Sequence, residues 1–166
     1  MKVQPFSIQI QQDVLTDLRA RIRSTRWPDS LPGVGWEQGT DLKYLQSLLS
    51  YWAVGFDWRK QEIELNRFQH FGAKLDGIHI HFVHERARIG QGIPLILTHG
   101  WPSTFVEVLP LVKFLIDPNS HGIEGPAFDV VIPSLPGYVF SQRPSRTGIN
   151  YRHVAALWHR LMRGLG

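Results

Sequence analysis

The sequence predicts an α/β fold in which a mostly helical N-terminal region precedes the start of a parallel sheet. In the first 70 residues, apolar side chains recur mostly at the spacing of amphipathic helices. Two strand-like runs, residues 69–75 and 78–84, then flank Asp76-Gly77, which is a strong hairpin signal. Beyond the hairpin, short apolar runs alternate with helical patterns, as in sheets whose parallel strands are joined by helices.

The N-terminal region is expected to hold a strand-like arm and three helices. Residues 6–10 alternate between apolar and polar side chains, and helical spacing follows over residues 14–22. A loop rich in proline and glycine, residues 31–39, separates this helix from the next. We expect Thr40 to cap the second helix and Asp57 to cap the third.

The second half of the chain predicts two strands, each followed by a helix. Residues 94–98 form an unbroken apolar run, which predicts a strand covered on both faces. Thr104 and Glu107 have the spacing of a capping box at the start of the next helix. A second apolar strand is expected over residues 128–132, and Asn150 is expected to cap the last helix.

The composition excludes several classes of function. Of the 166 residues none is cysteine, so disulfides, thiolate metal sites and a cysteine nucleophile are excluded. The net charge of +4 comes from 18 basic and 14 acidic residues spread along the chain, so no nucleic-acid partner is expected. No glycine-rich phosphate loop is present, so no nucleotide cofactor is expected, and we expect no cofactor of another kind. No apolar stretch suits a membrane span or a signal peptide, so we expect no membrane association and a cytoplasmic location.

The junction between the strand at residues 94–98 and the following helix is the most informative local feature. Its sequence is His99-Gly100-Trp101-Pro102. Glycine allows a close backbone approach, and the following helix N-terminus supplies amide donors and a positive dipole. Two interpretations stay open on these residues alone: an anion-stabilising loop and an ordinary tight strand-to-helix turn.

Two other patterns resemble functional sites but give weaker evidence for one. His79 and His81 share one face of their strand and could pair on a metal, whereas His84 falls on the opposite face. Because no carboxylate stands near them with obvious geometry, structural histidines are favoured and no metal is expected. Residues 35–39 copy the spacing of a nucleophile elbow, but no strand precedes them, so we reject that interpretation.

Several multi-residue motifs resemble those of the microsomal-type epoxide hydrolases, in the same order and over nearly the whole chain. The motifs are Arg26-Trp27-Pro28-Asp29, Gly35-Trp36-Glu37-Gln38-Gly39-Thr40, Asp57-Trp58-Arg59, Leu97-Thr98-His99-Gly100-Trp101-Pro102 and Ile132-Pro133-Ser134-Leu135-Pro136-Gly137-Tyr138-Val139-Phe140-Ser141. This resemblance implies an incomplete α/β-hydrolase sheet preceded by a mostly helical region. Residues 1–90 would form the N-terminal region with the first hairpin, and residues 91–166 the first part of the hydrolase core.

The resemblance also implies an activity and a set of site residues. The family adds water to epoxides, giving vicinal diols through an ester on an aspartate nucleophile. The main-chain amide of Trp101 is implied to belong to the oxyanion hole, with His99, Gly100 and Pro102 supporting the turn. A second family turn falls on Gly137, Tyr138, Phe140 and Ser141. Two departures from the family pattern are Ser103-Thr104 after the proline and Val139 in place of a smaller residue.

The resemblance places the aspartate nucleophile, the histidine and its orienting acid beyond Gly166. We therefore expect this chain alone to be inactive and its small-molecule epoxide to bind in a complete family member. The alternatives are a non-catalytic interaction module and one half of a split hydrolase completed by a second chain. The missing strand leaves an expected open sheet edge at Leu95, Ile96 and Leu97, through which the chain could associate with itself.

Overall fold

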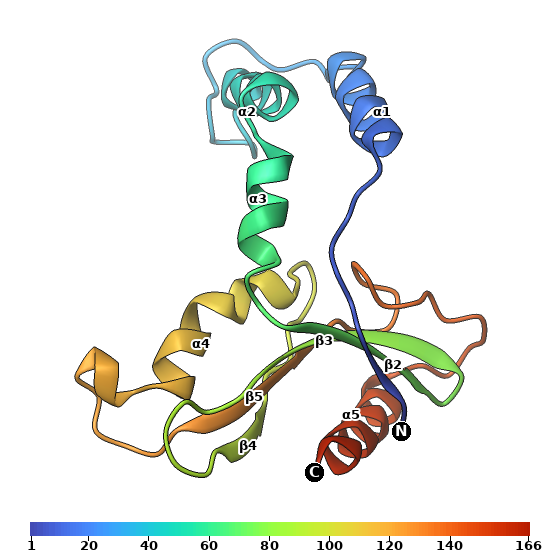
Figure 1. Ribbon diagram of the computed structural model, residues 1–166. Helices are drawn as coiled ribbons and strands as arrows, with labels where there is room; N and C mark the ends of the chain where they lie inside the picture. The colour runs from blue at the N-terminus through green and yellow to red at the C-terminus, as the bar shows by residue number, and fades with distance from the viewer. The chain divides into compact units, whose positions relative to one another are not determined.

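The computed structural model describes residues 1–166 and divides into two compact units (Figure 1). One unit is residues 8–65, and the other joins residues 1–7 to residues 66–166. The division near residue 90 that the resemblance implies stays a prediction. None of the helices has the length and apolar character that crossing a bilayer requires.

The unit of residues 8–65 contains three helices, α1 (Gln12–Arg23), α2 (Leu42–Val54) and α3 (Trp58–Leu65), of which α1 packs against α2. Asp57 caps α3 as predicted, since its carboxylate accepts a 3.1 Å hydrogen bond from the amide of Lys60. The cap predicted for α2 is wrong by one residue. Asp41, and not Thr40, accepts from the amide of Tyr44 at 2.7 Å.

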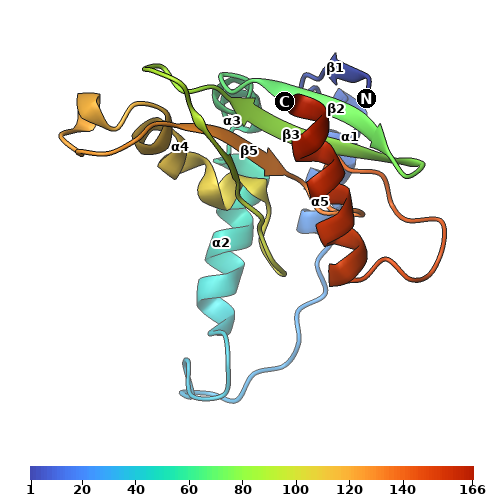
Figure 2. The ribbon, with the colours of Figure 1, turned by 90° about the horizontal axis from the view of Figure 1, so that it is seen from below.

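The other unit is built on a mixed five-stranded sheet in the order β1-β2-β3-β5-β4 (Figure 2). Its strands are β1 (Val3–Pro5), β2 (His70–Leu75), β3 (Ile78–Glu85), β4 (Ile93–Ile96) and β5 (Phe128–Pro133). Strands β4 and β5 are parallel, whereas all other neighbours are antiparallel. The α/β architecture and the parallel pair are thus confirmed.

The first strand lies earlier than the sequence pattern predicts. The alternating residues 6–10 are not a strand, and β1 instead pairs Val3 with Ala73 and Pro5 with Phe71. Strand β2 begins at His70, so residues that follow Phe6 have no residue of β2 to pair with. The pairing of this segment with β2 therefore ends with a 2.9 Å hydrogen bond from the amide of Phe6 to the carbonyl of His70.

The hairpin between β2 and β3 forms where Asp76-Gly77 predicts it. Asp76 has a φ of 49° and Gly77 a φ of 82°, the left-handed pair that a tight hairpin turn requires. Leu75 and Ile78 pair directly across the turn. This register places Ile78, Ile80 and Phe82 on one face of the sheet and His79, His81 and Val83 on the other.

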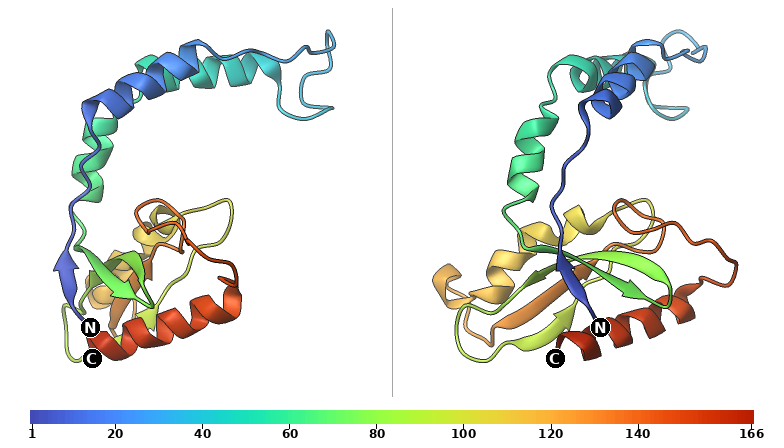
Figure 3. Two further views of the ribbon diagram at one scale, coloured as in Figure 1. Left: turned by 90° about the vertical axis from the view of Figure 1, so that its right-hand side faces the viewer. Right: turned by 45° about the vertical axis from the view of Figure 1, so that its right-hand side comes forward.

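Helices cover the two faces of the sheet (Figure 3). Helix α5 (Tyr151–Leu165) packs Leu157, Trp158 and Leu161 against one face in a buried cluster with Ile80 and Phe82. The opposite face is covered by the 3₁₀ helix η1 (Phe105–Val108) and by α4 (Leu109–Ile116). A second short 3₁₀ helix, η2 (Asn119–His121), leads from α4 towards β5.

Two helix starts follow the predicted caps, one of them with a different geometry. Asn150 caps α5, since its side chain accepts from the amides of Arg152 and His153 at 3.1 Å. Thr104 accepts from the amide of Val106 at 3.3 Å, so the predicted capping box with Glu107 does not form. The chain enters a 3₁₀ turn here before α4 begins.

Strand β4 is the last strand on its side of the sheet, as the expected open edge requires. The prediction that residues 94–98 are covered on both faces is wrong, because Pro94 and Thr98 are exposed and the three residues between them are only half-buried. The amide of Ile93 donates to the carbonyl of Ala127, just before β5, at 3.0 Å, and the amide of Leu97 donates to Val131 of β5 at 2.9 Å. By alternation, only Ile96 and Thr98 turn their N–H groups to the open side, where Pro94 has none to offer.

Candidate functional site

Two loops meet at the carboxyl ends of the parallel strands. Residues 97–104 follow β4 and residues 134–142 follow β5. Because β4 and β5 run parallel, both loops leave the sheet at the same edge. In open α/β sheets this edge is the usual place for a ligand.

The turn after β4 is tight, and the main-chain N–H of Trp101 is among the donors that it leaves unused. The Trp101–Pro102 peptide bond is cis, and the amide of Ser103 donates to the carbonyl of Gly100 at 2.9 Å. The indole of Trp101 is 82% exposed. The main-chain N–H of Trp101 makes no hydrogen bond to a protein acceptor in the structure.

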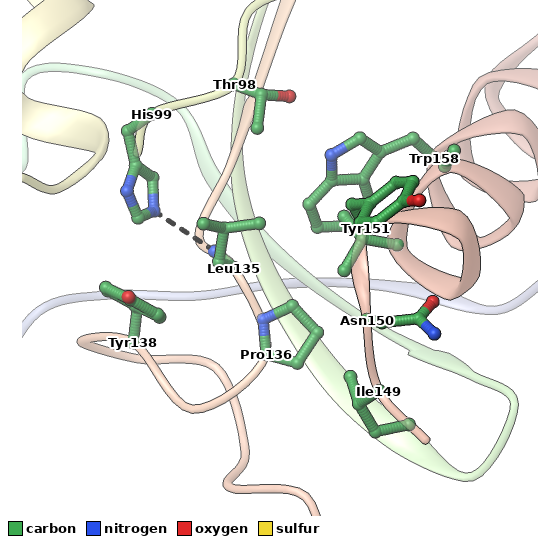
Figure 4. A pocket seen from close by; sticks show the side chains of 11 residues that line it. Thr98, His99, Leu135, Pro136, Tyr138, Ile149, Asn150, Tyr151 and Trp158 are labelled. Atoms are coloured by element: carbon green, nitrogen blue, oxygen red, sulfur yellow. Dashed lines mark hydrogen bonds between the residues drawn. The ribbon is translucent and has the colours of Figure 1, made fainter. Parts of the chain in front are cut away.

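His99 joins the two loops (Figure 4). Its side chain is only 4% exposed, and its Nε2 accepts a 3.1 Å hydrogen bond from the amide of Leu135. Its Nδ1 lies 3.3 Å from the carbonyl oxygen of Gly100. The ring of Tyr138 packs edge-on against the imidazole with centroids 5.2 Å apart. His99 therefore contacts the turn on one side and the second loop on the other.

The second loop forms consecutive tight turns. The amides of Tyr138 and Ser141 donate to the carbonyls of Leu135 and Tyr138, each at 2.9 Å. Gly137 has a φ of 86° and Val139 a φ of 46°. A β-branched side chain is disfavoured at positive φ, which gives a physical reason for the smaller residue that the resemblance leads one to expect at Val139.

A buried hydrogen-bond network, here called the His81 network, anchors this loop to β3. It consists of His70, His81, Ser134 and Ser141, all of which are buried. The Nδ1 of His81 lies 2.8 Å from the hydroxyl of Ser134, and its Nε2 lies 2.9 Å from the Nδ1 of His70. The hydroxyl of Ser141 donates to the carbonyl of Ser134 at 2.7 Å and accepts from the amide of His81 at 3.0 Å.

Aromatic rings enclose the imidazole of His81. The rings of Phe6, Phe105 and Phe140 lie with centroids 5.0, 5.0 and 5.2 Å from it. Burial, followed by electrostatic repulsion from His70, lowers the pKa of His81 to about 3. The ring is thus neutral near pH 7, where it acts through its hydrogen bonds.

The metal interpretation of the histidines finds no support in this geometry. Both ring nitrogens of His81 are engaged within the protein, whereas His79 is exposed. No group of three His, Cys, Asp or Glu side chains is placed to hold a metal ion. Residues 35–39, which copy the spacing of a nucleophile elbow, lie in turns and a bend with no strand before them, so they do not form an elbow.

A cavity of about 490 Å³ lies beside the two loops. One wall comes from Thr98, His99 and Tyr138, and the other from the first turns of α5, including Tyr151 (Figure 4). The remaining lining is mostly apolar: Leu135, Pro136, Ile149, Asn150, Val154, Ala155 and Trp158. The exposed indole of Trp101 is not part of this lining.

The structure brings together some of the predicted residues and adds others. His99 and Tyr138 from the two predicted turns are in contact, and Phe140 and Ser141 join His81. The roles of His70 and Ser134 were missed. The alternation Ile78, Ile80, Phe82 does place His81 on the other face with Val83, but it gives no sign of what covers that face.

A family profile described as "Epoxide hydrolase N terminus" matches residues 3–108. A curated relative from Stigmatella aurantiaca, whose name assigns it to the epoxide hydrolases, is 44% identical over 165 residues, which cover 99% of this chain and 38% of the relative. Epoxide hydrolase 1 from Oryctolagus cuniculus is 37% identical over 169 residues, covering 99% of this chain and 37% of that protein.

Solved structures of similar proteins share the fold. Juvenile hormone epoxide hydrolase from the silkworm Bombyx mori superposes with a TM-score of 0.88 at 32% identity, covering 99% of this chain and 39% of that one. Aspergillus niger epoxide hydrolase gives a TM-score of 0.83 at 30% identity, covering 100% of this chain and 44% of that one. The chain thus spans well under half the length of each relative.

Proposed function

Since this chain belongs to the epoxide hydrolase family and matches the N-terminal portion of its members, we propose that it builds the oxyanion-binding side of an active site that adds water to epoxides. The substrate in this proposal is a small-molecule epoxide. The free main-chain N–H of Trp101 is the observation that carries the proposal, because it stands at the ligand-binding edge of the sheet.

The proposed reaction has two covalent steps. An aspartate carboxylate attacks an epoxide carbon, the ring C–O bond breaks, and the released oxygen takes up a proton. Water, losing its proton to a histidine, then attacks the carbonyl of the resulting ester. The oxyanion that forms on this carbonyl needs preorganised donors, of which the Trp101 N–H is one. Collapse of the oxyanion breaks the ester C–O bond, the departing oxygen takes up the proton held by the histidine, and the acid loses its proton, which restores the carboxylate and releases the diol.

The remaining residues of the two loops have supporting roles in this proposal. His99, Gly100 and Pro102 shape the turn that carries the donor. Gly137, Tyr138, Phe140 and Ser141 shape the second loop, which the His81 network fixes to the sheet. Neither loop contains an Asp or Glu, so the nucleophile must come from elsewhere.

A hybrid protein tests the proposal. In it, residues 1–166 replace the matching segment of the Stigmatella aurantiaca relative and are followed by the rest of that protein. We expect the hybrid to convert a simple aryl epoxide to its diol. The unmodified relative provides the reference rate. A folded hybrid that does not turn over epoxides which the relative hydrolyses would contradict the proposal.

Residues 1–166 alone are expected to show no epoxide turnover. Covalent catalysis needs a positioned nucleophile, and an isolated oxyanion-binding turn has no ester to act on. The measurement is diol formation at increasing concentrations of the chain. Turnover that is proportional to the chain concentration and survives repurification would show that these residues hold a nucleophile of their own.

The open side of β4 favours a second proposal, that a further strand pairs there. The strand comes from the rest of the hydrolase, from a completing second chain or from another copy. Strand pairing needs donors on the open side, and only Ile96 and Thr98 provide them. The edge thus offers fewer free N–H groups than the predicted one at Leu95, Ile96 and Leu97, since the amide of Leu97 already donates to β5.

For the isolated chain we expect association that the substitution Ile93→Lys weakens. A charge on an exposed edge position discourages strand pairing, and Ile93 lies on the edge strand with 47% exposure. Sedimentation over a concentration series measures the effect, and the amide of Ile96 should exchange faster than that of Leu97 in dilute samples. The matched control is Ile63→Lys, which changes an exposed isoleucine on α3, away from any strand edge. Equal weakening by both variants, or a monomer at all concentrations, would contradict pairing at β4.

A further inference from the structure

The donor proposed for the oxyanion belongs to a peptide group whose other end is held by the protein. The N–H of Trp101 and the C=O of Gly100 are the two polar ends of one peptide unit. This bond is trans, because the only cis bond is the next one. In a planar trans peptide the C=O and the N–H point in opposite directions, so whatever fixes the Gly100 oxygen also aims the Trp101 N–H.

Two groups approach the Gly100 oxygen. The amide of Ser103 donates to it at 2.9 Å, and the Nδ1 of His99 lies 3.3 Å from it. A hydrogen bond to a peptide carbonyl also polarises the peptide, which makes its N–H a better donor. A carbonyl oxygen can only accept, so the contact with His99 is a hydrogen bond only if the Nδ1 of His99 carries a proton.

The second loop determines where the proton on His99 lies. The amide of Leu135 can only donate, and its acceptor at 3.1 Å is the Nε2 of His99. Nε2 therefore carries no proton, and the neutral ring must carry its proton on Nδ1. This is the nitrogen that faces the Gly100 oxygen, so the ring donates to one loop and accepts from the other.

We propose that His99, held in its Nδ1–H tautomer by the amide of Leu135, is the positioning residue that aims the Trp101 N–H at the developing oxyanion. The inference rests on the proposed function, and it excludes His99 as a general acid or base through Nε2. The His81 network holds the residue before Leu135, since the hydroxyl of Ser134 lies within hydrogen-bond distance of the ring of His81.

A double-mutant cycle in the hybrid protein tests this role. His99→Phe keeps an aromatic ring beside Tyr138 but removes both hydrogen bonds, and we expect kcat to fall about 10–100-fold with little change in KM. Replacing the Trp101 N–H by an ester oxygen removes the donor itself. If His99 acts through this N–H, His99→Phe should then cause no further loss. His159→Phe, on the exposed side of α5, serves as the control and should leave both constants unchanged.

The proton on His99 gives a readout independent of activity. In the ¹⁵N spectrum of the uniformly ¹⁵N-labelled hybrid, the Nδ1 of His99 should carry the proton, and Nε2 should couple across the hydrogen bond to the amide nitrogen of Leu135. A proton on Nε2 would overturn the proposal even if His99→Phe failed to fold. Additive losses in the cycle would overturn it while leaving the proposed function standing. No effect of the Trp101 ester on kcat would instead contradict the proposed function.

Discussion

Replacing the main-chain N–H of Trp101 by an ester oxygen in the hybrid protein is expected to lower kcat about 10²–10³-fold, the usual cost of losing one oxyanion-hole donor. Incorporation of indole-3-lactic acid at this position makes the change and keeps the indole. The donor acts on the oxyanion of the second step, so attack on the epoxide should be affected less. We therefore expect the ester intermediate to accumulate and to appear in intact-mass spectra as enzyme plus one epoxide.

Two controls separate the main-chain donor from the side chain and from the ester chemistry. The same ester at Trp36, whose indole is 61% exposed and whose N–H also lacks a protein acceptor, should leave kcat unchanged. Trp101→Phe should retain most of the activity, because it keeps the N–H and changes only an exposed ring. A large loss in Trp101→Phe, or none in the Trp101 ester, would contradict the assignment of the donor.

Local sequence signals predicted the elements that depend on neighbouring residues. Asp76-Gly77 predicted the hairpin, and Asn150 and Asp57 predicted two caps. These features arise from turn chemistry and from periodicity, which are written in a few adjacent residues. The resemblance added the order of the motifs and hence the α/β-hydrolase sheet, which the solved relatives confirm.

Features that depend on distant partners could not be predicted in the same way. The alternation of residues 6–10 is genuine, but the strand lies at Val3–Pro5 because β2 starts at His70. The apolar run of β4 predicted burial that an edge strand does not have. The contact between His99 and Leu135 spans 36 residues and joins a side chain to a main-chain amide. The amino-acid type at position 135 therefore does not indicate this contact.

The His81 network could not be predicted either, because its residues lie far apart in the sequence. It gives the second prediction. The folded 166-residue chain should lose stability as the pH falls from about 6.5 towards 3. The pKa of His81 is lowered to about 3 in the fold, mainly by burial, whereas an unfolded histidine has its pKa near 6.5. Between these values the unfolded chain binds one more proton. The free energy of unfolding should thus decrease by up to about 1.4 kcal/mol per pH unit from this group alone.

Proton uptake on unfolding isolates His81 from other acid effects. At pH 5 the wild-type chain should take up about one more proton than His81→Gln, because this histidine is neutral when folded and protonated when unfolded. Calorimetry in buffers of different ionisation enthalpy measures this number independently of how much each variant is destabilised.

Burial also lowers the pKa of His84, but that residue is present in both proteins and its contribution cancels. Val130→Ala, a buried change on β5 without a titrating group, should leave the uptake at the wild-type value. Equal uptake in His81→Gln and wild type would mean that the imidazole gains its proton without unfolding. The bonds to Ser134 and His70 could then not be the reason that the second loop stays fixed to β3.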